Sequence, residues 1–459
     1  MFKRILIANR GEIAIRVIRA CREMGIESVA IYSEADLESS HVSAADVAVC
    51  VGGAKSEESY RNIPAILQAA EQTEAKAIHP GYGFLAENAL FAELCNQLKF
   101  TFIGPSPRVM QLMGDKATAR RTMQAIGVPV VPGSEGLIEN VEHGLRLAKD
   151  IGYPVLLKAT AGGGGKGMRI CREESTFAQS FEQASMEAEK AFGNGGMYLE
   201  KLIERGRHIE FQFMADAFGN AIHLGERECS VQRNHQKLIE ESPSPVIDTA
   251  LRKEMGARVA DAVRTIGYVG AGTMEFLRGE DGSLYFMEVN TRLQVEHPVT
   301  EMVTGLDLVQ EQIRVAANHK LSVAQEDVQL AGHAIECRVN AEDPFDGFKP
   351  SPGLVERFEP PTTTDENVRI RVDTYVSGGT RIPVYYDSMI CKLIVAAGDR
   401  EAARKGMLGA LRHFRVDGIK TTIPLHTRIL ESQAFAKGDY NTDLVATLLS
   451  SGVSEVQHG

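Results

Sequence analysis

The sequence predicts a multi-domain protein of α/β and α+β type, with a doubly wound parallel sheet at the N-terminus and a mixed α+β domain at the C-terminus. Two patterns lead to this fold class. Over the first hundred residues, short apolar runs alternate with helical patterns, which is typical of a parallel sheet covered by helices. Farther along, strand-like runs follow one another across short turns, which is typical of antiparallel strands. The length of 459 residues allows about three domains.

The N-terminal region supplies the parallel sheet. RILIA, SVAIY, AKAIHP and FTFIGPS read as strands, and GEIAIRVIRACREMG places Ile13, Val17 and Cys21 at near-helical spacing. ANRGEIA lacks the G-x-G-x-x-G pattern of a dinucleotide site. The loops PGYGFLAEN and IGPSP follow strands, where open α/β sheets bind ligands. The region could therefore contact a ligand or serve only as a scaffold.

A glycine-rich loop separates two strands in the middle of the chain. PVLLKA reads as a strand, GGGGKG follows it, and another strand-like run begins at Met168. A Walker A loop joins a strand to a helix instead, so this loop is of another kind, and its glycines allow close approach to a ligand. Beyond it, GGMYLEKLIE reads as a strand ending in Glu200 and Lys201, and HIEFQFMAD and AIHLGERECSVQ read as an antiparallel pair.

Composition excludes several classes of function. The 50 basic and 61 acidic residues give a net charge of −11, which argues against nucleic acid or a membrane surface as the main partner. The 7 cysteines are dispersed and form no C-x-x-C pair, so zinc and redox motifs are unsupported. The sequence has neither a signal-peptide pattern nor an apolar run of about 18 residues, so a cytoplasmic location is expected.

The stretch MEVNTRLQVE, residues 287–296, alternates apolar and polar residues as a half-buried strand does. RGEDG, just before it, predicts a hairpin with GTMEFL, and a turn centred on Asp281 and Gly282 would place Glu275 opposite Glu288. Two facing carboxylates repel unless a cation lies between them, and Asn290 adds a third oxygen nearby. Such oxygens suit Mg²⁺, so the sequence predicts a metal site; the alternative is a pair of solvated acids.

Cations for phosphate groups are also present. Lys116, Lys158 and the GGGGKG loop are candidates, and together with the acidic pair they indicate a nucleotide site, although each lysine alone could be a surface residue. The segment ERECSVQRNHQKLIEE adds a dense group of polar side chains, including Gln232, His235 and Lys237. A lone histidine here could be structural or exposed, but the density of mixed polar groups favours a site.

Taken together and in order, the motifs of this sequence resemble the biotin carboxylase subunit of a biotin-dependent carboxylase, in the ATP-grasp superfamily. The matching stretches, from residue 6 to about 393, are IANRGEIAIR, HPGYGFLAEN, FIGPSP, MGDK, KATAGGGGKGM, HIEFQ, GERECSVQRNHQK, GAGTMEF, FMEVNTRLQVEHPVTE, ECRVNAEDP, PSPG and YYDSMICKL. The resemblance implies an N-terminal domain (1–113), an ATP-grasp domain with a mobile glycine-rich lid (114–330, lid about 130–203), a C-terminal domain (331–446) and a tail (447–459).

The resemblance also implies roles for individual residues. ATP would be bound at its phosphates by Lys116, Lys158, Gly164 and Gly165, at adenine by Glu200, Lys201, Leu202 and Ile203, and near the ribose and phosphates by His208, Gln232 and His235. Mg²⁺ or Mn²⁺ would be held by Glu275, Glu288 and Asn290, and bicarbonate by Lys237, Arg292, Gln294 and Val295. Glu296 would be the base that deprotonates bicarbonate, and Arg338 would face the ureido oxygen of biotin.

The implied activity is that of a ligase, the ATP- and bicarbonate-dependent carboxylation of biotin through carboxyphosphate, with release of ADP and phosphate. The sequence contains no Met-Lys-Met, the motif around the biotinylated lysine of carrier domains, so biotin is expected on a separate biotin carboxyl carrier protein. The implied reaction is the first half-reaction of acetyl-CoA carboxylase in fatty acid biosynthesis, with separate carboxyltransferase subunits. A homodimer is also implied, with Arg19, Glu23 and Arg371 as candidate interface residues.

Other functions remain open from the sequence. The subunit could serve a pyruvate or propionyl-CoA carboxylase instead. Another ATP-grasp enzyme, such as a purine-biosynthesis carboxylase or half of a carbamoyl-phosphate synthetase, could use the acidic hairpin and the glycine loop, but ECRVNAEDP, PSPG and YYDSM favour biotin carboxylase. A non-catalytic ATP-binding scaffold is a third possibility, and the retention of Lys237, Arg292, Glu296 and Arg338 argues against it.

These roles make one structural demand on residues 287–296. A continuous strand would hold Glu288 and Glu296 about 26 Å apart, at about 3.3 Å per residue, which is too far for one phosphoryl-transfer site. The strand should therefore end near Asn290, and the chain should then turn so that Arg292 to Glu296 fold back.

Overall fold

The computed structural model describes residues 1–159, 168–192, 194–363 and 365–451. It separates into two compact units that are discontinuous in sequence. The first unit comprises Met1–Val128, Arg207–Phe276 and Glu288–Gly459, and the second comprises Pro129–Gly206 and Leu277–Met287. No helix in the described ranges is long and apolar enough to cross a membrane.

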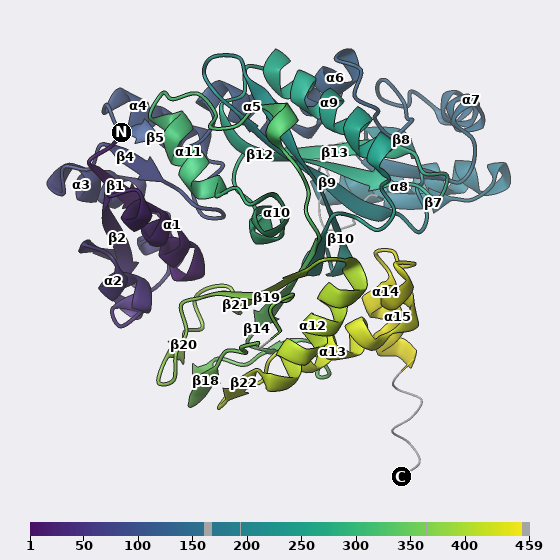
Figure 1. Ribbon diagram of the computed structural model, residues 1–459. Coiled ribbons are helices and arrows are strands. Elements are labelled where there is room, and N and C mark those ends of the chain that lie inside the picture. The colour runs from purple at the N-terminus through teal and green to yellow at the C-terminus, as the bar shows by residue number, and fades with distance from the viewer. Residues whose placement is uncertain (160–167, 193, 364, 452–459) are drawn as a thin grey trace, which may run out of the picture. The chain divides into compact units, whose positions relative to one another are not determined.

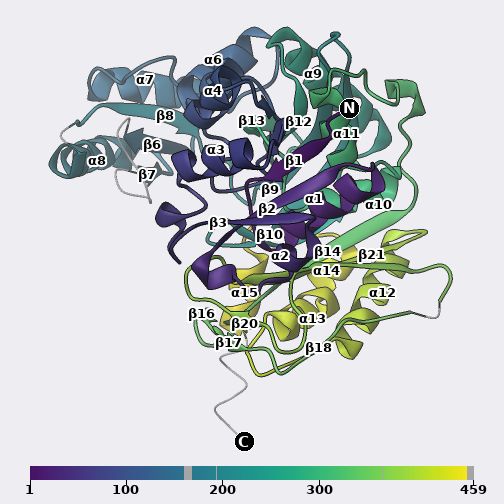
Figure 2. The ribbon, with the colours of Figure 1, turned by 90° about the vertical axis from the view of Figure 1, so that its left-hand side faces the viewer.

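The N-terminal part of the first unit is a five-stranded parallel sheet, in the order β3-β2-β1-β4-β5. This confirms the parallel sheet predicted from the sequence, and Figure 2 shows α1 lying along β1 and β2. Ile13, Val17 and Cys21 of α1 are buried against the sheet, which explains their helical spacing. The strands are β1 (Arg4–Ile7), β2 (Glu27–Ser33), β3 (Val47–Gly52), β4 (Ala77–His79) and β5 (Thr101–Phe102), and the helices are α1 (Gly11–Glu23), α2 (Ser40–Ala44), α3 (Ile63–Gln72), α4 (Ala89–Gln97), α5 (Pro107–Gly114) and α6 (Lys116–Ala125).

A larger sheet of eight strands runs in the order β13-β12-β9-β10-β11-β14-β21-β19 (Figure 1). Its antiparallel pairs include the predicted pair β9 and β10, and β12 and β13 are neighbours as the predicted hairpin requires. The C-terminal strands β14, β21 and β19 continue the same sheet beyond β11. The strands are β9 (Arg207–Ala215), β10 (Ala221–Arg233), β11 (Gln236–Ser242), β12 (Gly270–Arg278), β13 (Leu284–Asn290), β14 (His333–Asn340), β19 (Arg369–Thr374) and β21 (Met389–Ala397).

Helices cover the large sheet and remove its central strands from water. Helix α9 (Thr249–Thr265) packs against β9 and β10, and α10 (His297–Thr304) packs against β10, β11, β14 and β21. All nine residues of β9 are buried, polar ones included. A buried charge is tolerated only when it is paired, so the polar side chains of these strands must satisfy one another.

The rest of the first unit completes its C-terminal core. Helix α12 (Arg400–His413) packs on β14 and β21, and Leu444 and Val445 of α15 are buried in the same core. Helix α15 continues to Ser451, past residue 447 where the tail was expected to begin. The remaining elements are α11 (Leu308–Ala316), α13 (Ile423–Glu431), α14 (Gln433–Lys437), α15 (Leu444–Ser451), β15 (Glu342–Asp343), β16 (Lys349–Pro350), β17 (Gly353–Leu354), β18 (Arg357–Glu359), β20 (Arg381–Ile382) and β22 (Arg415–Asp417).

The second unit is built on a three-stranded antiparallel sheet, β7-β6-β8. The predicted strands on either side of the glycine-rich loop are present as β6 (Val155–Ala159) and β7 (Met168–Cys171), and β8 (Met197–Lys201) ends where the sequence indicated. Helices α7 (Val141–Ile151) and α8 (Phe177–Phe192) pack against this sheet around a core that includes Phe177. The loop itself, with Gly164 and Gly165, lies outside the described residues.

Candidate functional site

Strand β13 ends at Asn290, and the chain turns there, as the sequence demanded. The Arg292 side chain folds back along this turn, with Nη2 donating to Asn290 Oδ1 at 3.3 Å and Nη1 to Gln294 Oε1 at 2.9 Å. Glu296 then stands at the N-terminal end of α10. The alternating polar residues of this stretch therefore lie on both sides of a turn and do not share one face of a long strand.

Lys237, on β11, is the centre of the buried charges. Its Nζ donates to Glu210 at 2.6 Å, to Glu275 at 3.1 Å and to Glu296 at 2.6 Å. Burial alone would lower the pKa of Lys237, but these three carboxylates outweigh it and hold the pKa well above its usual value. The lysine is therefore a fixed ammonium that joins β9, β11, β12 and the start of α10.

Glu296 is fully buried and sits between two cations. One carboxylate oxygen accepts from Lys237, and the other accepts from Nη2 of Arg338 at 3.0 Å. Burial raises the pKa of Glu296, but Lys237, Arg338 and the nearby Arg227 outweigh that effect, so the net pKa is lowered. The carboxylate is thus held ionised and in a fixed orientation, which is the state that a general base requires.

Glu275 connects this group of charges to the turn. Its Oε1 accepts from Asn290 Nδ2 at 2.8 Å and from Gln294 Nε2 at 3.2 Å, and its Oε2 lies 2.8 Å from His208 Nε2. Burial raises the pKa of Glu275, but Lys237 and His208 hold it well below its usual value. Glu275 is therefore an ionised acceptor for a cation.

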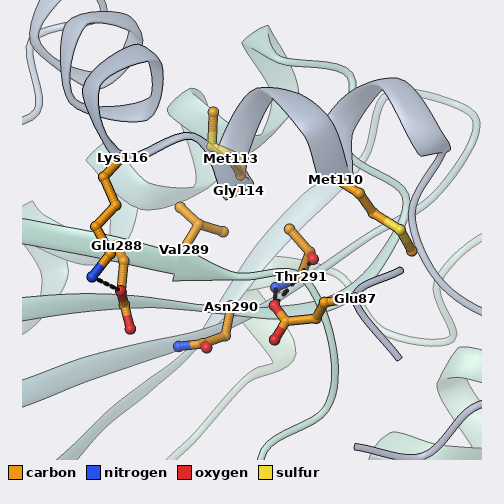
Figure 3. Close-up of a pocket in the computed structure, with 9 residues that line it drawn as sticks. All are labelled: Glu87, Met110, Met113, Gly114, Lys116, Glu288, Val289, Asn290 and Thr291. Atoms are coloured by element: carbon orange, nitrogen blue, oxygen red, sulfur yellow. Dashed lines mark hydrogen bonds and ion pairs between the residues drawn. The ribbon is translucent and has the colours of Figure 1, made fainter. Parts of the chain in front are cut away.

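A pocket in the first unit opens beside the end of β13. It is lined by Glu87, Met110, Met113, Gly114, Lys116, Glu288, Val289, Asn290 and Thr291. In Figure 3, Lys116 and Glu288 point toward each other, and their Nζ and Oε2 atoms are 3.2 Å apart. Both side chains reach solvent, so they are available to a ligand, with exposed fractions of 83% for Lys116 and 37% for Glu288.

The residues assigned to the metal fit a hard divalent cation. Glu275 and Glu288 offer carboxylate oxygens, and Asn290 offers an amide oxygen whose amide nitrogen already donates to Glu275. Oxygen donors of this kind suit Mg²⁺, which usually completes its shell with water and substrate phosphates. A bound ion would supply positive charge to the phosphates at this edge of the site.

Two other groups of possible metal ligands lie in the described ranges: His208, Glu210 and Glu275, and Glu210, Cys229 and Glu296. In both groups Lys237 already joins the two carboxylates by hydrogen bonds. Burial raises the pKa of the Cys229 thiol well above its usual value, so this sulfur is protonated and a poor ligand. In both groups Lys237 therefore already supplies one positive charge to the carboxylates.

Glu87 is a site residue that sequence reasoning missed. One carboxylate oxygen accepts from the Thr291 backbone N–H at 2.9 Å, and the other accepts from Arg292 Nε at 2.8 Å (Figure 3 shows the first contact). The residue lies in PGYGFLAEN, the loop that was expected either to contact a ligand or to act as a scaffold. Its presence in a loop after a strand was the available signal, but nothing local identifies Arg292 as its partner.

The other sequence-predicted residues fall in two places. In the first unit, Gln232 lies at the end of β10, and His235 lies in the tight turn to β11 with a φ of +65°. The backbone carbonyl of Val295 accepts a hydrogen bond from Lys392 at 3.0 Å. In the second unit, Lys158 pairs with Glu200, and Lys201 Nζ donates to the carbonyls of Gly152 and Tyr153 at 2.9 Å. Leu202 and Ile203 follow β8 directly.

The candidate interface residues form contacts within the chain. Arg371 pairs with Glu301 and Asp373 at 2.7 and 2.6 Å and is largely buried. Arg19 remains 43% exposed, so it is the more accessible of the two arginines to a second subunit. Glu23 accepts from Gln310 at 2.8 Å.

Comparison with family models covers most of the chain. Residues 1–110 match "Biotin carboxylase, N-terminal domain", residues 115–324 match "Carbamoyl-phosphate synthase L chain, ATP binding domain", and residues 336–447 match "Biotin carboxylase C-terminal domain". Among curated proteins, the biotin carboxylase of Nostoc sp. is 55% identical over 444 residues, which is 97% of this chain and 98% of that protein.

Solved structures give the same result. The biotin carboxylase domain dimer of Hydrogenobacter thermophilus 2-oxoglutarate carboxylase, in complex with MgADP, ADP and bicarbonate, is 51% identical, with a TM-score of 0.87 over 98% of this chain and 99% of that one. The biotin carboxylase subunit of a pyruvate carboxylase is 50% identical, with a TM-score of 0.89 over 98% of this chain and 99% of that one.

Proposed function

This chain belongs to the biotin carboxylase family of ATP-dependent ligases, and we propose that it carboxylates biotin with bicarbonate and ATP at the site around Glu296. The observation that carries this proposal is the environment of that carboxylate. It is buried, held ionised between Lys237 and Arg338, and placed just after the turn that bears Arg292 and Gln294. A base, an anion-binding guanidinium and a second cation are thus built into one part of the first unit.

The first step uses the base and the anion site. Arg292 and Gln294 bind and orient bicarbonate, and Glu296 removes its proton while a bicarbonate oxygen attacks the γ-phosphorus of ATP. ADP leaves, and carboxyphosphate is formed. Lys237 stabilises the negative charge that gathers near Glu296, because its ammonium is already fixed by three carboxylates. Mg²⁺ held by Glu275, Glu288 and Asn290 would add positive charge at the phosphates.

The second step transfers the carboxyl group. Carboxyphosphate decomposes to CO₂ and phosphate, the phosphate takes the N1′ proton of biotin, and N1′ attacks CO₂. Negative charge moves to the ureido oxygen of biotin as the proton leaves. Arg338 can stabilise that oxygen because its guanidinium stays protonated and its side chain is 16% exposed.

The remaining assignments are part of the same proposal. Lys158, Glu200, Lys201, Leu202 and Ile203 would contact the nucleotide, together with His208, Gln232 and His235 of the first unit. We keep the domain limits at 1–113, 114–330 and 331–446. We also expect a homodimer, which the dimer of the Hydrogenobacter thermophilus relative supports. A cytoplasmic location and a separate carrier protein for biotin are expected from the sequence alone.

The most specific part of the proposal is the identity of the acyl acceptor. We favour acetyl-CoA, with carboxyltransferase subunits that complete the reaction, while relatives from 2-oxoglutarate and pyruvate carboxylases keep those acceptors as alternatives. The test supplies the chain with a biotinylated carrier and measures which carboxyltransferase accepts the carboxylated carrier. Transfer only to pyruvate or 2-oxoglutarate would reject acetyl-CoA.

One assay tests the activity itself. Bicarbonate-dependent ADP release is measured with and without free biotin. A biotin carboxylase should release ADP faster when biotin is present, and carboxybiotin should accumulate in step with it. Bicarbonate-dependent ADP release without a response to saturating biotin would favour another ATP-grasp ligase. Absence of any ATP cleavage would favour the non-catalytic scaffold.

Replacing Arg338 with glutamine should separate the two half-steps. Biotin carboxylation should fall by about 10²–10³-fold, because one charged donor to a developing oxyanion is lost. Bicarbonate-dependent ATP cleavage without biotin should fall by much less, since Glu296 keeps its bond to Lys237. Both rates are measured on the same preparation, with thermal melting as a check on folding. Equal loss of both would remove the assignment of Arg338 to biotin.

Glu87→Ala should weaken bicarbonate binding. The substitution removes the acceptor that fixes Arg292 Nε, so the guanidinium loses one of the contacts that orient it. A charge-assisted hydrogen bond contributes about 1.5–3 kcal/mol when buried, and partial exposure reduces this, so we expect KM for bicarbonate to rise about tenfold. KM for ATP should change less. An unchanged KM for bicarbonate would show that Glu87 has no part in orienting Arg292.

A further inference from the structure

Two glutamates behind Arg338 form a buried acid pair. Glu240 on β11 and Glu336 on β14 are directly paired in the antiparallel ladder, so their side chains leave the same face of the sheet. Both residues are 0% exposed. Arg338 follows Glu336 by two positions on β14 and shares that face.

The hydrogen bonds of this pair are few. Glu240 Oε1 accepts from Arg338 Nε at 2.6 Å. Glu240 Oε2 and both carboxyl oxygens of Glu336 have no hydrogen-bond partner among the described residues. An ionised carboxylate with no donor is one of the most costly groups to bury.

The charges around the pair offer little compensation. The charged and titratable groups that interact with it are Lys237 on β11, Cys229 on β10, Arg338 on β14, Lys392 on β21 and Glu296 at the start of α10. Lys237 is occupied by three other carboxylates, and Lys392 pairs with Glu12 at 3.1 Å and donates to a carbonyl. Arg338 therefore balances Glu240 and Glu296, and among the described residues neither oxygen of Glu336 has a donor.

The electrostatics of the pair agree with this geometry. Burial raises the pKa of Glu240 to about 7 even though Arg338 lowers it. Burial also raises the pKa of Glu336 well above its usual value, although Lys392 lowers it, and the neighbouring Glu240 raises it further. Two like charges that share one small buried volume cannot both be present at neutral pH.

We propose that Glu240 and Glu336 carry one proton between them at neutral pH and act as positioning residues for Arg338. The ionised member binds Nε of the guanidinium, while the protonated member keeps a third carboxylate from competing for it. The bonds of Arg338 to Glu240 and Glu296 use Nε and Nη2, which leaves Nη1 for a ligand. The inference rests on the proposed function in that this ligand is the ureido oxygen of biotin.

The sign of the pH effect follows from the state of the pair. At neutral pH the proton is present and Arg338 is shared by two carboxylates. As pH rises through the upper pKa of the pair, the proton is lost and a third buried carboxylate appears beside Arg338. The guanidinium is then drawn inward, so biotin carboxylation should decline at alkaline pH before bicarbonate-dependent ATP cleavage does.

Glu336→Gln tests the inference because glutamine imitates the protonated acid and cannot ionise. The ratio of biotin carboxylation to biotin-independent ATP cleavage is measured against pH in the wild type and the variant. We expect the alkaline decline of this ratio to move upward by about one pH unit or more in Glu336→Gln, since the second ionisation is abolished. Taking the ratio cancels effects of pH on steps that both reactions share.

A second measurement does not depend on activity. Infrared difference spectra of the whole protein, recorded as pH is raised, should contain the carbonyl band of a buried protonated carboxylic acid in the wild type. That band should be absent from Glu336→Gln. As the matched variant, Glu240→Gln replaces the ionised acceptor of Arg338 with a neutral amide oxygen and should lower the ratio at every pH, by about tenfold.

The outcomes separate the inference from the proposed function. A wild-type protein that does not carboxylate biotin defeats the proposed function, whereas the infrared band still reports the proton. The inference is overturned if the active wild-type protein lacks the band. It is also overturned if Glu336→Gln shows the same band and the same pH profile as the wild type. If Glu240→Gln melts at a lower temperature but leaves the ratio unchanged, its role is only structural and the positioning of Arg338 is rejected.

Discussion

Glu288→Lys should abolish ATP cleavage while leaving the protein folded. The Glu288 carboxylate lies 3.2 Å from Lys116 Nζ and lines the same pocket as Asn290, whose amide donates to Glu275. A lysine would remove one metal ligand and place a second ammonium next to Lys116, which repels both the metal and its neighbour. Loss of a catalytic cation costs several kcal/mol of transition-state stabilisation, so we expect ADP release to fall by about 10³-fold or more.

Folding should survive this substitution because Glu288 is 37% exposed and its replacement remains in contact with water. Met287→Lys is the matched control. It adds the same ammonium one residue earlier on the strand, where the side chain is 42% exposed and points to the other face. Mn²⁺ binding to both variants gives a readout besides activity. ATP cleavage near the wild-type rate in Glu288→Lys, or equal loss in Met287→Lys, would contradict the metal assignment.

The elements of the fold that local pattern specifies were predictable. The alternation in residues 287–290 and the turn after Asn290 follow from strand geometry and from the distance that the chemistry allows. The strands on both sides of the glycine-rich loop were also found, because their apolar runs are bounded by glycine and proline. In the same way, the spacing of Ile13, Val17 and Cys21 was sufficient to predict α1.

Partners far apart in sequence were not predictable. Nothing in PGYGFLAEN indicates that Glu87 meets Thr291 and Arg292, because that contact depends on how the loop approaches the end of β13. The pairing of Glu240 with Glu336 depends on β14 joining β11 in one sheet, whereas the sequence pattern suggested only that a new α+β region begins near residue 331. Side-chain pattern gives the face of a strand but not its neighbour.

Glu296→Gln should remove bicarbonate-dependent ATP cleavage and biotin carboxylation together. Glutamine has the shape of glutamate, and its one acceptor oxygen can still bond to Lys237 or Arg338, but it cannot take the proton of bicarbonate. Loss of a positioned base lowers a rate by about 10²–10⁴-fold. Both reactions need the same deprotonated bicarbonate, so both should fall by the same factor. This distinguishes Glu296→Gln from Arg338→Gln, in which the two rates separate.

Glu210→Gln is the matched control for charge. Glu210 also bonds to Lys237, at 2.6 Å, and it is as deeply buried as Glu296, so both variants leave one carboxylate fewer around the same ammonium. If Glu296 only neutralised Lys237, the two variants would lose the same activity.

The pH profile of activity also tests whether Glu296 is the base. Because Lys237 and Arg338 outweigh burial and lower the pKa of Glu296, wild-type activity should decline on the acid side only as pH falls through that lowered pKa, and the residual activity of Glu296→Gln should show no such decline. A Glu296→Gln enzyme with the wild-type acid limb would require another residue to be the base.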